Sequence, residues 1–256
     1  MAPAASGLRR RQTRRVSFEH WLAAAGDLLL GARCHGCGQA WWGICPSCRQ
    51  RLASQRPFFT VPVPRPDGFP VTVTSSAYDP ILRSVINAHK ERQALTLTSL
   101  LAERLALSVD ALLMSEPHSA GGIVLVPIPS AARAVRRRGF DATASIARLA
   151  ARRLRMRYPM TVRLALTQGR PVADQAGLRA AARQENLFGA FRLRKPITTG
   201  AAVLVDDLVT TGSSLTEAAR VLRAARISVL GAATVAATVR LRPPKVHQIG
   251  DYGQLP

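Results

Sequence analysis

Two adjacent carboxylates, Asp206 and Asp207, directly follow an apolar run that ends at Val205. A turn of small and hydroxyl-bearing residues comes next: Thr210, Thr211, Gly212, Ser213 and Ser214. Apolar residues then recur at helical spacing over 215–222, so the order is typical of strand, loop and helix. Because a β-branched run is typical of a buried parallel strand, and ligands of α/β proteins bind where such strands end, residues 205–214 predict a ligand site.

The residue types of this turn favour a phosphate. Gly212 lets the backbone approach a ligand closely, and the loop amides can point at an anion over the positive end of the next helix. Asp206 and Asp207 would repel a phosphate, so we expect them to accept hydrogen bonds from vicinal ribose hydroxyls. The pattern predicts a ribose 5-phosphate. The alternative, acids that only cap a helix and end a strand, explains fewer of the features that occur here in register.

All four cysteines lie within fifteen residues, as two CxxC pairs seven residues apart: Cys34, Cys37, Cys45 and Cys48. Four thiolates at this spacing predict a closed, structural zinc site. Redox-active or disulfide-linked pairs are the alternative. Trp41 and Trp42 are expected to form the small core of this module, with stacking on nucleic-acid bases as the alternative.

A second buried strand is predicted over residues 122–129, and a cationic loop over 130–141 follows it. Arg136, Arg137 and Arg138 of this loop are expected to grip a diphosphate, since guanidinium groups bind such anions in bidentate fashion. A solvated arginine surface or a nucleic-acid contact is the alternative. Asp141 is expected to cap the following helix.

Residues 167–191 are polar and poorly periodic, and they precede the key strand. They favour a mobile cover that excludes water from the crevice, with Arg183 as a diphosphate contact. An ordinary surface hairpin is the alternative.

The rest of the chain predicts one main domain with small appendages. We expect a disordered basic tail over 1–16, a helix and the zinc module over 17–55, a main domain over 71–242 and a flexible tail over 243–256. Residues 56–70 hold five prolines and are expected to be a linker. Further expectations are a strand over 71–78, a helix begun by Asp79 and Pro80, a long helix over 95–114 and a strand over 227–239. Lys90, at the end of the Asp79 helix, either faces an anion or is solvated.

The composition indicates a polyanion as partner. Thirty-six Lys and Arg against fifteen Asp and Glu give a net charge of +21, and without the five arginines of residues 1–15 the chain still carries +16. A high-GC genome that favours arginine codons is the alternative cause. No apolar run approaches the roughly 20 residues that span a bilayer, and no signal-peptide pattern is present, so we expect a cytoplasmic protein.

Taken together, these motifs resemble the ComF family, whose members are phosphoribosyltransferase-like proteins linked in some bacteria to DNA uptake during competence. The resemblance runs from Cys34 to Val239 and is carried by five features: the double CxxC, Tyr78 with a helix ending at Lys90, VPIP with RRRGF (126–140), QAGL with Arg183 and Asn186, and VDDLVTTGSS (205–214). It implies a type I phosphoribosyltransferase-like parallel sheet flanked by helices, with a small N-terminal four-cysteine zinc module. Asp141 departs from the family's usual Asn, and Arg226-Ile227 from its usual Gly-Ala.

Two functions follow from this resemblance. The first is an enzyme that binds 5-phosphoribosyl 1-diphosphate (PRPP) with Mg²⁺ and transfers the phosphoribosyl group to a nitrogen acceptor with release of diphosphate. Asp206 and Asp207 would be its catalytic residues, acting mainly by positioning and charge stabilisation. The second is a non-catalytic accessory protein that handles single-stranded DNA.

Overall fold

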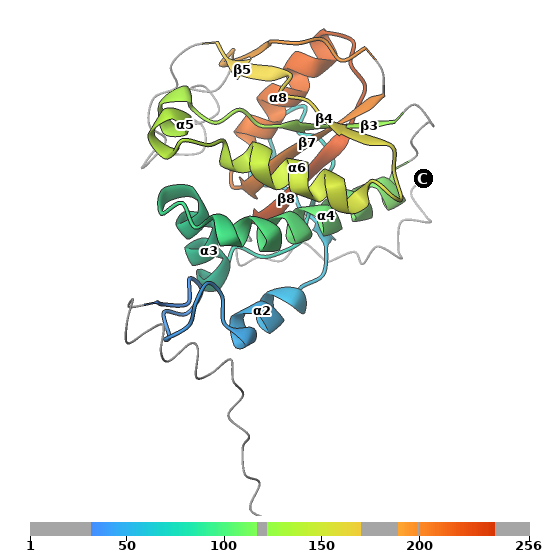
Figure 1. The fold of residues 1–256 in the computed structure, drawn as a ribbon. Helices are drawn as coiled ribbons and strands as arrows, with labels where there is room; N and C mark the ends of the chain where they lie inside the picture. Colours follow the sequence, from blue (N-terminus) through green and yellow to red (C-terminus); the bar gives the residue numbers. More distant parts are fainter. Residues whose placement is uncertain (1–31, 117–121, 170–188, 199, 239–256) are drawn as a thin grey trace, which may run out of the picture.

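The computed structural model describes residues 32–116, 122–169, 189–198 and 200–238 (Figure 1). Its centre is a six-stranded sheet in the order β1-β2-β8-β7-β3-β4, in which only the β1–β2 pairing is antiparallel. The expected α/β class with a mostly parallel sheet is confirmed. The strands of this sheet are β1 (Phe58–Phe59), β2 (Thr72–Thr74), β3 (Ile123–Pro127), β4 (Met160–Val162), β7 (Ala201–Val209) and β8 (Val229–Ala237). A separate antiparallel pair comprises β5 (Leu166–Gln168) and β6 (Phe191–Leu193).

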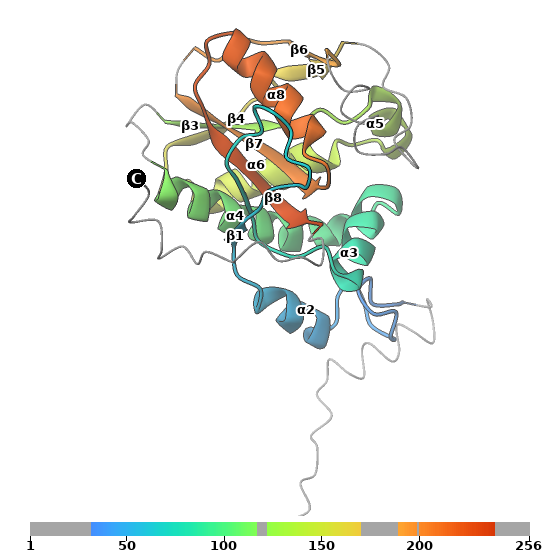
Figure 2. The ribbon, with the colours of Figure 1, turned by 180° about the vertical axis from the view of Figure 1, so that it is seen from behind.

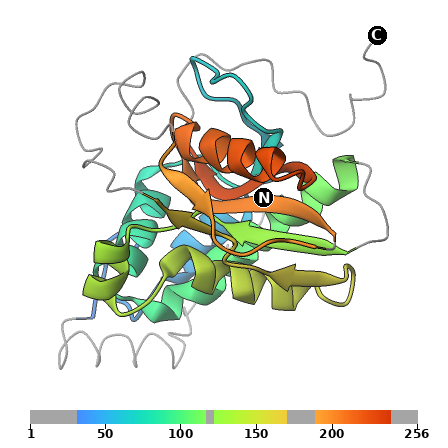
Figure 3. The ribbon, with the colours of Figure 1, turned by 90° about the horizontal axis from the view of Figure 1, so that it is seen from above.

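Helices cover both faces of the sheet. One face packs against α3 (Pro80–Glu91), α4 (Thr98–Ser115) and α6 (Ala142–Leu154), and the other against α8 (Ser213–Ala224) (Figure 3). Because successive side chains of a strand point to opposite faces, Val203 and Val205 of β7 enter the first core and Ala202 and Leu204 enter the second. The run of apolar residues that predicts a buried strand is thereby explained.

Helices α3 and α6 begin at the residues that the sequence predicts. The side chain of Asp79 accepts a hydrogen bond from the Leu82 amide at 2.8 Å, and Asp141 accepts one from the Ala144 amide at 3.1 Å. Each carboxylate satisfies an amide that has no partner within its own helix. The start of α3 and the start of α6 are therefore confirmed.

The cationic segment after β3 is a helix, α5 (Ala132–Arg138), and the expected loop over 130–141 is wrong at this point. Alanine and arginine are strong helix formers, and they outnumber the residues that favour turns. The helix ends at Gly139, which adopts φ 75° and forms the C-cap.

Four further segments differ from expectation. The strand expected over 71–78 shortens to β2, and the helix expected over 95–114 becomes a 3-10 turn, η1 (Leu95–Leu97), followed by α4. Residues 56–70 are more than a linker, since they contribute β1 and bury Phe69. The key strand runs past Val205 to Val209, because its pairing with β8 continues to Ala237.

The following parts of the chain lie outside the described residues: the basic tail over 1–16, the helix expected over 17–30, Arg183 with the central part of the expected cover, and the tail over 243–256. Among the helices that are described, none combines the length and the hydropathy that a bilayer crossing requires.

Candidate functional site

The candidate site lies where the chain changes direction in the sheet. Strand β3 is flanked by β4 on one side and by β7 on the other, and the segments that follow β3 and β7 lead to helices on opposite faces. The carboxyl ends of these two strands adjoin, since Pro127 is the register partner of Val205 and the Ile128 amide donates to the Val205 carbonyl at 2.9 Å. Such a point of divergence leaves a crevice in which ligands of open α/β sheets bind.

The turn after β7 presents free amides at the start of α8. Gly212 is the N-cap and adopts φ 76°. Within the described part of the chain, no acceptor is found for the backbone amides of Thr210, Thr211 or Gly212. The side chains of Thr211 and Ser213 bond to each other, with 2.9 Å between their hydroxyl oxygens. These features suit an anion placed over the helix N-terminus.

The space beside this turn is small. Residues 206 and 208–215 line a pocket of about 30 Å³, which has room for only a few water molecules. A Cβ atom on Gly212 would lie 2.6 Å from the ring of Phe69 and 2.9 Å from Pro62. Figure 2 shows the segment between β1 and β2 beside α8, where the Arg223 guanidinium donates to the Gly68 carbonyl at 2.8 Å. The space that a side chain at position 212 would need is therefore filled by the segment between β1 and β2.

The two aspartates have different surroundings. Asp206 lines the pocket, and its Oδ1 accepts a hydrogen bond from the Asp207 amide at 2.8 Å. Asp207 is 3% exposed and lies 2.6 Å from the Nζ of Lys90. They are consecutive residues of a strand, so their side chains leave on opposite faces of the sheet.

The surroundings of the two aspartates shift their pKa values in opposite directions. Burial and the neighbouring Asp207 carboxylate raise the pKa of Asp206 well above its ordinary value. Burial would also raise the pKa of Asp207, but the charge of the Lys90 ammonium together with hydrogen bonds from Lys90, Asp206 and the backbone lowers it. Burial opposes the charge of Lys90 too, yet the aspartates raise its pKa. Of the two carboxyl groups, Asp207, which is paired with Lys90, is therefore the one that ionises more readily.

The last turn of α3 connects β7 to α5, a connection that the sequence did not reveal. The ring of His89 meets the ring of Phe140 edge-on, with centroids 5.4 Å apart. Lys90 pairs with Asp207. Glu91 pairs with Arg137 and lies 3.8 Å from Arg138. Burial lowers the pKa of His89 to about 4, so this imidazole is neutral and bonds to the Thr98 hydroxyl at 3.0 Å.

The arginines expected to grip a diphosphate are mostly bound within the protein. Arg138 is buried and donates to the Ala134 carbonyl of its own helix at 3.1 Å, and Arg137 is held by Glu91. Arg136 is exposed. Their contact with a diphosphate stays a prediction.

A second pocket, of about 160 Å³, opens at the carboxyl end of β3. Ser130, Asp141, Gln168 and Arg194 supply most of its polar lining, and the Ser130 hydroxyl approaches Asp141 at 3.4 Å. Gln168 and Arg194 lie close to β3 only because β5 and β6 pair beside it, which sequence spacing does not show.

The acid pair does not fit a magnesium ion. Mg²⁺ is usually bound through one or two ionised carboxylates in octahedral geometry. Asp207 is already paired with Lys90, and the pKa of Asp206 is raised. The ammonium of Lys90 holds the position where a cation would neutralise these acids.

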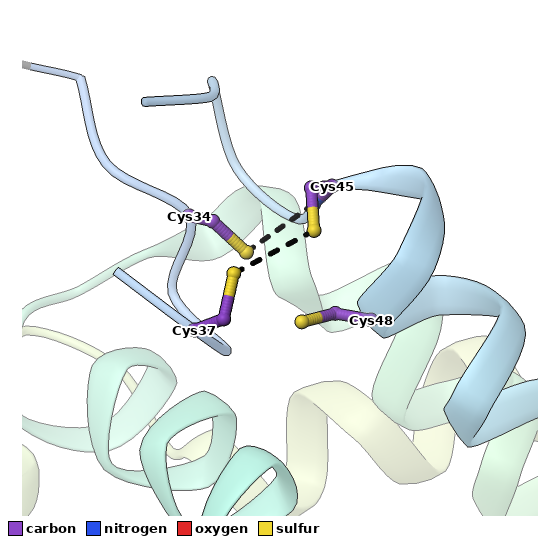
Figure 4. A group of neighbouring side chains, drawn as sticks. All are labelled: Cys34, Cys37, Cys45 and Cys48. Carbon is purple, nitrogen blue, oxygen red and sulfur yellow. Dashed lines mark hydrogen bonds between the residues drawn. The ribbon is translucent and has the colours of Figure 1, made fainter. Parts of the chain in front are cut away.

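The four cysteines converge on one point (Figure 4). Their sulfur atoms all lie within 4.8 Å of one another, and Cys37 and Cys45 are 3.7 Å apart. A tetrahedral zinc with bonds of about 2.3 Å places its sulfur ligands about 3.8 Å apart, so the donor set fits that metal. The amides of Gly36 and Cys45 each donate to the Cys34 sulfur at 3.3 Å. Burial opposes ionisation of this thiol, but these hydrogen bonds lower its pKa to about 7.

The cysteine cluster is packed against the main sheet domain. Cys48 and Leu52 belong to the same core as Leu82 and Val85 of α3. The expectation that both tryptophans are core residues is right for Trp41, which packs against this core, and wrong for Trp42, which is 64% exposed.

Sequence comparisons with known proteins identify relatives of this chain. The fold and the cluster define a mixed α/β protein with a mostly parallel sheet and an N-terminal four-cysteine site. No family model matches the chain. It is 30% identical to the DNA utilization protein YhgH of Escherichia coli O6:H1 over 199 residues, which cover 71% of this chain and 84% of that protein, and 29% identical over the same shares to that of strain K12. The protein of the same name from Salmonella typhi is 30% identical over 200 residues. The chain belongs to the family of the DNA utilization protein YhgH.

Proposed function

We propose that this protein acts in DNA utilization as a DNA-binding accessory protein. The observation that carries the proposal is the similarity to proteins named DNA utilization protein YhgH, which extends over 84% of their length. The net charge of +21 supports it, because such a charge attracts a polyanion over a long range. This function was the second of the two that the resemblance to ComF proteins implied.

Single-stranded DNA binding by the full chain tests this proposal. Fluorescence anisotropy of a labelled oligonucleotide should show binding at low salt, with log K falling against log[salt] by about 0.7 for each phosphate contacted. Failure to bind at low salt, or an affinity that does not respond to salt, would contradict it.

A second candidate is the binding of PRPP, with phosphoribosyl transfer to a nitrogen acceptor. The free amides of the turn after β7, beside Asp206 and at the point where the sheet diverges, support it. In this proposal the amides of Thr210 to Ser214 hold the 5-phosphate. Asp206 bonds to a ribose hydroxyl, and Asp207 balances the charge of Lys90. Arg136 and Arg183 are left as the diphosphate contacts, and no step is assigned to Mg²⁺.

Calorimetric titration with PRPP separates the two candidates. Wild type should release or take up heat, Asp206→Asn should bind at least about tenfold more weakly because its altered donor pattern disturbs the bond to the sugar, and Asp110→Asn should bind as wild type. Asp110 is a fair control because its carboxylate pairs with Arg157 far from the turn. If wild type gives no heat with PRPP, the second candidate is wrong while the DNA-binding proposal stands.

For the cysteine cluster we propose a structural zinc ion held by Cys34, Cys37, Cys45 and Cys48. Four sulfur donors leave no open coordination position, so the metal would stabilise the fold and take no part in chemistry. Elemental analysis should find about one zinc per chain.

A further inference from the structure

Positive charge is concentrated in one part of the described chain. Residues 130–163, which include α5, α6 and β4, contain ten arginines and a single acidic residue, Asp141. Residues 32–116 contain nine basic and six acidic residues. A genome-wide preference for arginine codons would raise the arginine content of both segments. It does not explain why residues 130–163 contain so few acids. The imbalance therefore marks a feature of the α5–α6 region.

Several arginines of this region project into solvent without a partner. Four others are bound: Arg137 and Arg138 to Glu91, Arg153 to Ser99, and Arg157 to Asp110. Five of the remaining six belong to α5 and α6 or to the C-cap of α6, and they are exposed with no side-chain hydrogen bond or ion pair to any described residue: Arg133, Arg136, Arg148, Arg152 and Arg155. We call these five side chains the arginine face. Since no described acid lies within ion-pair distance of these five arginines, their combined field is directed at the solvent.

The arginine face spans two consecutive helices, α5 and α6. Figure 1 shows α5 and α6 following each other along the chain, with α6 lying in front of the sheet. Arg148 and Arg152 are one helical turn apart, about 6 Å along the axis, and Arg155 follows them at the C-cap of α6. Like charges at i and i+4 destabilise a helix by some tenths of a kcal/mol, so this row costs stability unless an anion binds it.

The arginine face suits contacts with a phosphate backbone better than the stacking of bases on aromatic rings. Its neighbouring aromatic rings are not available for stacking, because Phe140 packs on His89 and Tyr158 is buried. Sequence-independent DNA binding depends on contacts between cationic side chains and phosphates. The turn after β7 is a different candidate site, built from amides and carboxyl groups, and in the PRPP proposal it shares only Arg136 with the arginine face.

We propose that the arginine face is the surface that binds the phosphate backbone of DNA. This inference rests on the proposed function, which says that the protein binds DNA but not where. The bound strand runs along α5 and α6, and binding shows no preference for base sequence.

Two triple variants of equal charge test the location. Arg148→Gln/Arg152→Gln/Arg155→Gln removes part of the arginine face. Arg83→Gln/Lys195→Gln/Arg226→Gln removes three exposed cations that lie elsewhere and have no ion pair among the described residues. Both sets are exposed, so both variants should keep the thermal unfolding midpoint of wild type, which is measured first.

Anisotropy with a mixed-sequence single-stranded oligonucleotide then gives the result. In the first variant the slope of log K against log[salt] should be less steep by about 2, since three phosphate contacts of about 0.7 each are lost. Its affinity should fall at least about tenfold at moderate salt, and the second variant should stay within about twofold of wild type. Equal losses in both variants, or none in the first, would overturn the arginine face while DNA binding itself stands. If wild type does not bind, the proposed function fails instead.

Discussion

At the scale of single residues, Asp206 and Asp207 show what a motif can and cannot predict. The sequence places two carboxylates at the end of a buried strand, and the structure has them there. Because the strand continues through both residues, only Asp206 lines the pocket, and Asp207 points to the face that carries α3. The partner of Asp207 could not be found from spacing, since Lys90 is more than a hundred residues away and meets it only through the order of the strands.

Replacing Lys90 with Met should destabilise the protein. Asp207 would then be a buried carboxylate without a cation, and removal of one partner from a buried pair typically costs about 3 kcal/mol or more. Urea unfolding at neutral pH measures the loss. Arg83→Met, on the exposed side of the same helix, should change the free energy of unfolding by less than about 0.5 kcal/mol. Equal stability of the two variants would mean that the Lys90–Asp207 pair does not matter to the fold.

At the scale of elements, local chemistry predicts where helices begin, whereas long-range packing decides which segments between the elements are buried. The caps at Asp79 and Asp141 could be predicted because capping involves residues three positions apart. The burial of Phe69 could not, because a proline-rich segment carries no periodic signal, and its partner Gly212 lies far along the chain. Helix α5 differs from the expected loop because the alanine and arginine residues of this segment favour a helix, whatever anion the arginines contact.

The turn between β7 and α8 should tolerate no side chain at position 212. Gly212→Ala introduces a Cβ atom both at positive φ and 2.6 Å from the Phe69 ring. Gly139→Ala has nearly the same φ, 75°, but meets nothing within 4 Å. We expect the control to cost about 1 kcal/mol from backbone strain alone, and Gly212→Ala about 3 kcal/mol because overpacking is added.

Chemical unfolding of both variants measures the difference between the two glycines. Similar losses would show that the segment between β1 and β2 moves away easily, and that the turn is more open to ligands than its small pocket suggests. The difference between the variants is more informative than either value, because backbone strain contributes equally to both.

At the scale of the whole molecule, the cysteine cluster and the sheet are parts of one packed body. The spacing of the cysteines was sufficient to predict that they come together, since the module is local in sequence. Its attachment to the sheet was not predictable. Arg104, buried in α4, donates to the Gln55 carbonyl at 2.8 Å and also to the Ser76 hydroxyl, and the Gln55 side chain accepts from the Ala77 amide at 2.9 Å. Gly36 lies so close to Cys48 and Ile81 that a Cβ atom there would be about 3 Å from both.

Removal of the proposed zinc ion should therefore destabilise the whole chain and not only the N-terminal module. With the cluster lost, Cys48 and Leu52 no longer support α3, whose last turn holds Asp207 and α5. We expect Cys48→Ser to lose the zinc and to unfold in a single transition, roughly 10 °C lower, for a loss of about 3 to 5 kcal/mol. Ser47→Ala, in the same CxxC pair, should keep both metal and midpoint. Calorimetry with elemental analysis decides the matter: a separate low-temperature transition, with the main one unchanged, would show that the cysteine module unfolds independently of the sheet.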